Sequence, residues 1–175
     1  GDWSSDVCSS DLFYDASIRD WLKKQNINDL GIFLKDYRHF LSFQNTELFS
    51  KDIKVHGTFK LSQLLSLVYM LDIPKKLVLF GDSSETDTLI YVLFFHILTE
   101  MNDVTTEWEK IKHLEAFKLT DFQDTKLLNR LHLIQTKKRV KNYKPQMKIY
   151  IRKIHTNDQP EVPDWLSPYL EHVTF

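Results

Sequence analysis

The chain has 175 residues, with 24 acidic and 23 basic side chains and a low content of glycine and proline. This near balance of charge lacks the strong field that is typical of nucleic-acid-binding proteins. The length and the apolar content fit one folded domain, or most of one. The longest apolar run, residues 89–98 with His96 inside it, is too short to span a bilayer and indicates a buried helix. We therefore expect a cytoplasmic protein, either free or in peripheral contact with a membrane.

Residues 1–12, GDWSSDVCSSDL, are unlike the rest of the chain. Back-translation of residues 2–12 gives a DNA string that matches a common short-read sequencing adapter in one reading frame. We therefore interpret residues 1–12 as a non-native, adapter-derived segment and leave them out of the fold; the alternative is a polar native tail. The segment holds Cys8, the single cysteine, so disulfides and a thiolate zinc site are excluded for the remainder. We expect native residues upstream of Phe13, so that residues 13–175 form the C-terminal part of a domain.

The first native segment predicts a helix followed by a short strand. Residues 15–25, DASIRDWLKKQ, place apolar side chains at helical spacing with charges between them. Residues 26–29 are expected to form a turn and residues 31–36, GIFLKD, a strand. Residues 37–55 are polar and irregular, with scattered apolar side chains that would hold the segment against the core.

The middle of the chain predicts a helix, a strand and a further helix. Thr58 is a candidate N-cap, and apolar residues behind it recur at helical spacing until residues 72–74, DIP, end the pattern. Residues 77–80 are continuously apolar, as in a buried parallel strand, and the apolar helix of residues 89–98 follows. This alternation of helices and strands predicts a parallel α/β fold.

After residue 99 the pattern changes. Residues 105–116 predict a weaker helix and residues 124–140 a longer amphipathic one. Residues 147–154, MKIYIRKI, alternate in polarity, which predicts a strand, and residues 157–163 contain two prolines and predict an extended loop. We treat residues 99–146 as a helical insertion whose role the sequence leaves open.

Two carboxylates follow the strand of residues 77–80, in the segment LVLFGDSSETDTLIY. The apolar run stops at Gly81, Asp82 and Ser83, and Asp87 comes just before the next helix. Ligands of open α/β sheets bind at the carboxyl ends of the strands, and carboxylate oxygens suit magnesium. The segment therefore predicts a Mg²⁺ site formed by Asp82 and Asp87. On pattern alone, helix capping is an equally good explanation of the same two carboxylates.

These residues carry a resemblance to a known family. The spacing GD-x-x-x-x-D is the form taken by the fourth motif of haloacid dehalogenase (HAD) superfamily phosphatases, and GDSSETDTLIY more closely resembles the phosphatidate phosphatase catalytic domain of the actin-patch-protein type. Three further segments agree with the family in order. Residues 13–37 resemble the helix and strand that follow the family's Ser-Pro-Trp motif, and Lys60 resembles its third-motif lysine. Residues 149–152, IYIR, resemble the strand that closes the catalytic core. The resemblance implies a HAD-like, Rossmann-like parallel sheet with flanking helices, whose N-terminal part is missing.

The resemblance also implies a magnesium-dependent phosphatase that works through an aspartyl-phosphate. Asp82 would hold Mg²⁺, and Asp87 would support the metal by orienting a metal-bound water or Lys60. Lys60 would neutralise charge on the transferring phosphoryl group, and Ser83 would fix the loop or contact the substrate. The nucleophile belongs to an Asp-x-Asp motif that we expect upstream of Phe13. The implied substrate is phosphatidate, converted to diacylglycerol, and a soluble phosphate monoester is equally compatible with these residues.

Two rival functions stay open. FGDS also resembles the nucleophile block of GDS-type serine esterases, with Ser83 as the nucleophile. Those enzymes need a later Asp-x-x-His, whereas the single such pattern here, Asp36 to His39, precedes Ser83. The second rival is a non-catalytic α/β domain that binds a partner or a lipid surface.

Lysines alone do not decide between these functions. Lys60, taken by itself, is typical of a solvated helix end. A basic run near the end of the last predicted helix is also typical of a solvated helix end, and it is compatible with contact to anionic lipid as well. The run consists of Lys137, Lys138, Arg139, Lys141 and Lys144.

Overall fold

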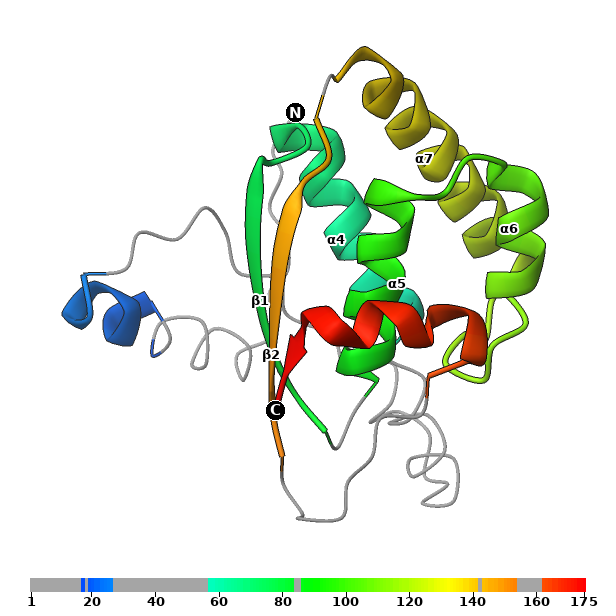
Figure 1. The fold of residues 1–175 in the computed structure, drawn as a ribbon. Helices are drawn as coiled ribbons and strands as arrows, with labels where there is room; N and C mark the ends of the chain where they lie inside the picture. Colours follow the sequence, from blue (N-terminus) through cyan, green and yellow to red (C-terminus); the bar gives the residue numbers. More distant parts are fainter. Residues whose placement is uncertain (1–16, 18, 27–56, 84–85, 142, 154–161) are drawn as a thin grey trace, which may run out of the picture. The chain divides into compact units, whose positions relative to one another are not determined.

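The computed structural model describes residues 17, 19–26, 57–83, 86–141, 143–153 and 162–175 (Figure 1). Contacts divide the chain into two compact units, Gly1–Phe49 and Ser50–Phe175. In the first unit, residues 19–24 are helical as predicted, and Asn26 has a φ of 55° in the turn that follows. Four predicted segments lie wholly or mostly outside the described residues: the adapter-like residues 1–12, the strand of residues 31–36, the irregular residues 37–55, and the loop of residues 157–163.

The second unit is built on a parallel sheet of three strands in the order β1-β2-β3. β1 (Lys76–Asp82) pairs along its whole length with β2 (Gln146–Arg152). The two-residue β3 (Val173–Thr174) pairs with the other edge of β2. Among the described strands, the outer edge of β1 is unpaired. The predicted α/β class with a parallel sheet is thus confirmed, and the strands of residues 77–80 and 147–154 lie where they were expected.

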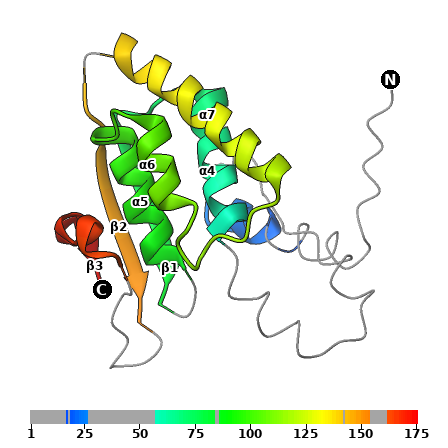
Figure 2. The ribbon, with the colours of Figure 1, turned by 90° about the vertical axis from the view of Figure 1, so that its right-hand side faces the viewer.

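Helices pack against one face of this sheet (Figure 2). α5 (Asp87–Thr99) lies against β1 and β2, α4 (Gly57–Leu71) lies beside α5, and α7 (Asp121–Val140) packs on both helices. α5 is therefore enclosed by the sheet on one side and by helices on the other, which explains why nearly all of its side chains are apolar. In the part of the chain that the structure describes, no helix combines the length and the apolarity needed to cross a bilayer.

The start of α4 differs from the prediction. The helix begins at Gly57, so Thr58 lies inside the first turn and is buried instead of serving as the N-cap. Gly57 is closely packed: a Cβ built on it would lie 2.5 Å from the carbonyl oxygen of Ala116, so only a residue without a side chain allows this approach. The predicted end of the helix is confirmed, because α4 stops at Leu71 and Asp72 follows with a φ of 75°.

Residues 99–146 form an outer layer of the same unit. α6 (Val104–Ile111) and α7 confirm the two predicted helices, although α6 ends five residues before the predicted residue 116 and α7 begins earlier than expected. The earlier start comes from a capping box, in which Thr120 accepts from the backbone N–H of Gln123 and the Gln123 side chain accepts from that of Thr120. Arg130 of α7 donates to the carbonyl oxygen of Ser62 in α4 at 3.0 Å. α7 therefore supports α4 directly.

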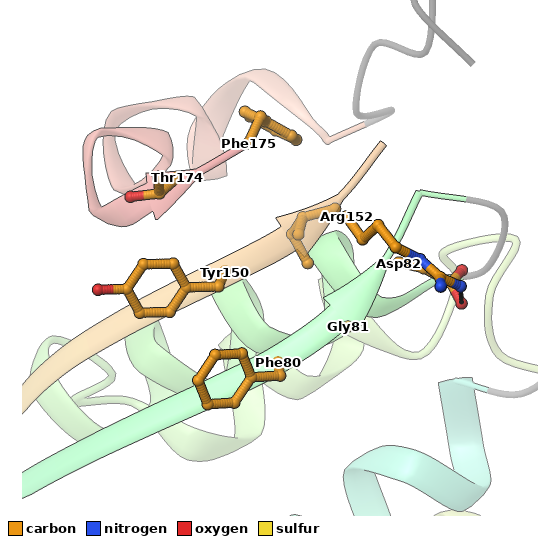
Figure 3. A pocket seen from close by; sticks show the side chains of 8 residues that line it. Phe80, Gly81, Asp82, Tyr150, Arg152, Thr174 and Phe175 are labelled. Atoms are coloured by element: carbon orange, nitrogen blue, oxygen red, sulfur yellow. Dashed lines mark ion pairs between the residues drawn. The ribbon is translucent and has the colours of Figure 1, made fainter. Parts of the chain in front are cut away.

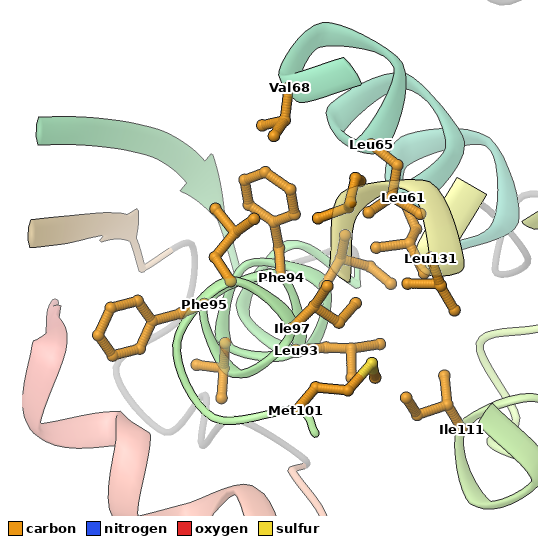
Figure 4. Packing of buried hydrophobic residues seen from close by; sticks show 14 of the residues in the cluster. Leu61, Leu65, Val68, Leu93, Phe94, Phe95, Ile97, Met101, Ile111 and Leu131 are labelled. Atoms are coloured by element: carbon orange, nitrogen blue, oxygen red, sulfur yellow. The ribbon is translucent and has the colours of Figure 1, made fainter. Parts of the chain in front are cut away.

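The hydrophobic core is centred on α5 (Figure 4). Leu93, Phe94 and Ile97 are almost fully buried, and they meet Leu61 and Leu65 of α4 together with residues of α6 and α7. A fully buried aliphatic or aromatic side chain contributes about 1.5–3 kcal/mol. The position of α5 is therefore strongly determined, and with it the position of the polar residue at its start, Asp87.

The C-terminal residues form an element that was not predicted. η1 (Asp164–His172) is a 3₁₀ helix that packs on α5 and leads into β3. His96 of α5 connects three elements: its Nδ1 lies 2.8 Å from the Tyr169 hydroxyl of η1, and its Nε2 lies 2.5 Å from the Glu107 carboxylate of α6. His96, the polar interruption of the apolar helix, thus has a structural role far from the start of α5.

Lys138 of α7 closes the other end of α5. Its ammonium donates to the carbonyl oxygens of Ile97 and Met101, each at 2.8 Å, which satisfies carbonyls that the end of a helix leaves unpaired. Burial lowers the pKa of Lys138 from 10.5 to about 8, against a smaller opposing effect of Glu107 and Glu100.

This lowered pKa predicts a pH dependence of stability. Between pH about 8 and 10.5 the unfolded chain binds a proton at Lys138 that the folded chain has released, so the contribution of Lys138 to the free energy of unfolding rises with pH in this window. We expect the difference in unfolding free energy between wild type and Lys138→Met to grow as the pH is raised from 8 to 10.5 in urea titrations. Lys126→Met, on an exposed part of the same helix, should show no such trend; a constant difference for Lys138→Met would contradict the prediction.

Candidate functional site

The structure brings Lys60, Asp82 and Asp87 together at the carboxyl end of β1. Lys60 lies in the first turns of α4, Asp82 ends β1, and Asp87 begins α5. The Lys60 ammonium donates to Oδ1 of Asp87, a residue 27 positions away in the sequence. Oδ2 of Asp87 accepts from the backbone N–H of Asp82 at 3.1 Å. Three elements therefore converge on one carboxylate.

Asp87 is held tightly at the carboxyl end of β1. The residue is only 6% exposed, and both of its carboxylate oxygens have protein donors, one from Lys60 and one from the Asp82 backbone. A buried carboxylate is stable in such a place only when it is paired and hydrogen-bonded. Asp87 thus fixes the Lys60 ammonium and the backbone at the end of β1.

Gly81 makes this arrangement possible. A Cβ at residue 81 would lie 2.5 Å from Oδ2, 2.6 Å from Cβ and 2.8 Å from Cγ of Asp87. The last residues of β1 can therefore approach Asp87 only if residue 81 has no side chain. One residue earlier, the Phe80 carbonyl accepts from the Tyr91 hydroxyl of α5 at 2.9 Å. Gly81 and Tyr91 together fix the end of β1 against the start of α5.

Asp82 lies beside the neighbouring strand instead. It is paired in register with Arg152 of β2, and its Oδ2 lies 3.9 Å from the Arg152 guanidinium (Figure 3). The backbone N–H of Ser83 donates to the Arg152 carbonyl at 3.0 Å. The sequence had placed Arg152 only in a strand that closes the core. Its position beside the acidic loop comes from the pairing register, which no local pattern reveals.

An open hollow borders Asp82 on the sheet face that carries no described helix. Its volume is about 540 Å³, and Phe80, Tyr150 and Phe175 contribute aromatic rings to its lining (Figure 3). The Phe80 and Tyr150 rings are stacked with their centroids 5.3 Å apart, and Phe80 is 72% exposed. The two predicted metal carboxylates are thus in different surroundings: Asp87 is enclosed among helices, whereas Asp82 borders open space.

The donor set fits magnesium through Asp82. Mg²⁺ in proteins takes one or two carboxylates and keeps several water ligands, so a carboxylate next to open space, such as Asp82, is suitable. Asp87, with both oxygens already accepting hydrogen bonds, fits the supporting position that the resemblance implies. Among the described residues, no group of three or more histidine, cysteine, aspartate or glutamate side chains is placed to hold a metal by itself.

The catalytic machinery of a serine esterase would need a histidine beside Ser83. Asp36 and His39, the single Asp-x-x-His pattern, lie outside the described residues. His96 is engaged with Glu107 and Tyr169 near the end of α5 that is remote from Ser83. His96 is therefore not the base of such a site, and His39, His56 and His155 lie outside the described residues.

The chain was compared with known protein families, curated proteins and solved structures. No protein-family model, no curated protein and no solved structure matches the chain.

The contact between Lys60 and Asp87 predicts a strong energetic coupling. Their side chains are 22% and 8% exposed, and removal of one partner leaves the other charge poorly solvated. We expect Asp87→Ala to cost about 3 kcal/mol, at the low end of the range for a buried pair. The double variant Lys60→Met/Asp87→Ala should cost less than the sum of the single variants by about 1–3 kcal/mol.

The measurement is urea unfolding of the four proteins in this cycle. The pair Lys112–Glu109 is a matched control, because its carboxylate is largely exposed and the two residues are neighbours on the helix surface. Its coupling should be only about 0.5 kcal/mol. Equal coupling in both cycles would show that the Lys60–Asp87 contact is not a buried pair.

Proposed function

We propose that the chain carries the metal-binding and charge-neutralising part of a magnesium-dependent phosphatase of the HAD type. The observation that carries this proposal is the contact from Lys60 to Asp87 and on to the Asp82 backbone. The motif order predicted these three residues as one site, although Lys60 lies on a separate helix. A simple helix cap would explain Asp87 but would not require a lysine from α4.

Each residue has a defined task in this proposal. Asp82 holds Mg²⁺, which when bound neutralises phosphate oxygens and orients the ester. Asp87 positions the Lys60 ammonium, and Lys60 stabilises the negative charge that develops on the transferring phosphoryl group. Ser83 maintains the loop through its backbone contact with Arg152. On the resemblance, the nucleophile is an aspartate upstream of Phe13, which attacks phosphorus and forms an aspartyl-phosphate.

The proposed substrate class is a phosphate monoester. Phosphatidate, with diacylglycerol as the product, follows from the resemblance. The aromatic hollow beside Asp82 suits an ester with an apolar portion. A water-soluble monoester satisfies Lys60 and Asp82 equally well.

The test is magnesium-dependent phosphate release by the chain joined to an upstream segment that carries the Asp-x-Asp motif required by the proposal. Para-nitrophenyl phosphate serves as the soluble substrate, and phosphatidate in detergent micelles as the lipid substrate. The proposal predicts turnover of at least one of them, while residues 1–175 alone should release none, because the nucleophile is not supplied. If residues 1–175 released phosphate and Asp82→Asn abolished that release, the nucleophile would lie within residues 1–175 and not upstream of Phe13.

A further inference from the structure

A mixed apolar and basic patch lies at the end of the second unit that is opposite the candidate site. α4 and α7 both end there, and β1 and β2 begin there (Figure 1). Met70, Leu71 and Val140 are 62%, 57% and 79% exposed, and Tyr69 beside them is also exposed. Three large aliphatic side chains that face water on adjacent helix ends are unusual for a surface without a partner.

Contacts between the two helices show that the patch is continuous. The Lys137 ammonium of α7 donates to the Tyr69 carbonyl of α4 and lies 5.0 Å from the Tyr69 ring centroid. Lys141 forms an ion pair with Asp72 at 2.5 Å. Val140 lies between these two lysines in the sequence and is the last residue of α7, so it belongs to the end of α7 that contacts the end of α4.

The charge around these apolar side chains is positive. Lys75 and Lys76 are exposed at the start of β1, and the Lys75 ammonium lies 5.8 Å from the Tyr143 ring centroid. Among the described residues, no carboxylate lies within ion-pair distance of Lys75, Lys76 or Lys137, whereas Lys141 and Lys144 are each paired with one. The aliphatic side chains are thus bordered by three cations that form no ion pair with a described carboxylate, although Lys137 lies near enough to Asp72 to help lower its pKa.

We propose that this patch binds the surface of an anionic lipid membrane. Cations near such a surface are attracted to acidic headgroups, and aliphatic side chains enter the boundary between headgroups and acyl chains. Nucleic acid is a poorer match, because methionine, leucine and valine offer neither stacking surfaces nor hydrogen bonds to bases. The basic run of α7 is therefore one part of a binding surface that includes the end of α4.

The position of the patch has a consequence for the substrate, which depends on the proposed phosphatase function. β1 runs from Lys76 at the patch to Asp82 at the site, a length of about 20 Å for a strand of this size. A protein bound through the patch holds Asp82 away from the bilayer. This arrangement favours a water-soluble phosphate monoester over a phospholipid in the same membrane.

The experiment is co-sedimentation of the full chain with vesicles, and it does not depend on turnover. Vesicles of phosphatidylcholine with phosphatidylserine are compared with vesicles of phosphatidylcholine alone. We expect binding only to the anionic vesicles, weakened by added salt. Lys75→Gln/Lys76→Gln should lower the partition coefficient about 25-fold, at about fivefold for each cation. Met70→Ser/Leu71→Ser should lower it about tenfold.

The opposite end of α7 supplies a matched control. Phe122 is 74% exposed, and the Lys126 ammonium lies 5.8 Å from its ring centroid, so Phe122→Ser/Lys126→Gln removes an equivalent apolar and basic pair elsewhere. This variant should bind vesicles as the wild type does. Equal binding to both kinds of vesicle, or an equal loss of binding in the control variant, would overturn the proposal. So would duplex DNA binding if both it and vesicle binding persisted in Met70→Ser/Leu71→Ser.

Discussion

Replacement of Asp82 by alanine is expected to abolish phosphate-ester turnover in the chain joined to the upstream Asp-x-Asp segment that the proposed function requires. Asp82 ends a strand that is paired along its whole length with β2, and it borders open space, so the substitution removes the carboxylate that is proposed to hold the metal. Asp87→Ala should leave measurable activity, reduced about 10–100-fold as for groups that support a metal ligand. Added magnesium should partly restore that activity, because the metal carboxylate itself remains.

The ranking of Asp82→Ala, Asp87→Ala and Ser83→Ala by remaining activity is more informative than the loss of activity in any one of them. Ser83→Ala should have the mildest effect of the three, because the proposed mechanism does not require Ser83 as a nucleophile or as the metal carboxylate. Steady-state assays over a range of magnesium concentrations separate the apparent metal affinity from kcat. If Asp87→Ala were as inactive as Asp82→Ala at every magnesium concentration, Asp87 would act at the reacting atoms and its supporting role would be wrong.

Gly81→Ala is expected to disrupt the site without changing any charged residue. The new Cβ would lie within 2.8 Å of three Asp87 atoms, so either the end of β1 or the start of α5 must move. Overpacking of this kind costs about 1–3 kcal/mol. Displacement of Asp87 from Lys60 and from the Asp82 N–H adds to that cost. Urea unfolding should show the loss of stability, and turnover should fall together with it.

The same substitution made in the variant Asp87→Gly tests whether the loss of stability comes from Asp87. In Asp87→Gly the three close atoms are gone, so the further change Gly81→Ala should cost little stability. The comparison therefore asks whether the intolerance of residue 81 comes from Asp87 alone. If Gly81→Ala lowered the unfolding free energy equally in the wild type and in Asp87→Gly, the clash would not involve Asp87. Asp87 would then not be the reason why residue 81 must be glycine.

The central elements could be predicted because their determinants are local. Residues 77–80 are continuously apolar and are followed by a Gly-Asp turn, which is the pattern of a buried strand that ends at a ligand site. The helix of residues 89–98 is apolar on every side because α5 is enclosed on every side. Lys60 was connected with Asp87 through the order of motifs and not through periodicity, because 27 positions separate them.

Other features could not be read from local patterns. The position of Arg152 beside Asp82 depends on the register between β1 and β2, and the need for Gly81 depends on where Asp87 lies in space. η1 contains Pro168, and Leu166 is its one fully buried residue, so it shows no clear apolar periodicity. Its anchoring comes from contacts with α5, such as that of Tyr169 with His96.

Two hydrolysis rates, measured with and without a chelator, distinguish a magnesium-dependent phosphatase from a serine esterase. The measurement compares the release of phosphate from a phosphate ester with the hydrolysis of a carboxyl ester, using wild type, Asp82→Ala and Ser83→Ala of the upstream-extended chain, each with and without a chelator. The account predicts phosphate release that chelation and Asp82→Ala abolish and that Ser83→Ala largely retains. Carboxyl-ester hydrolysis that resists the chelator and is lost in Ser83→Ala would contradict it and would establish the serine esterase mechanism instead.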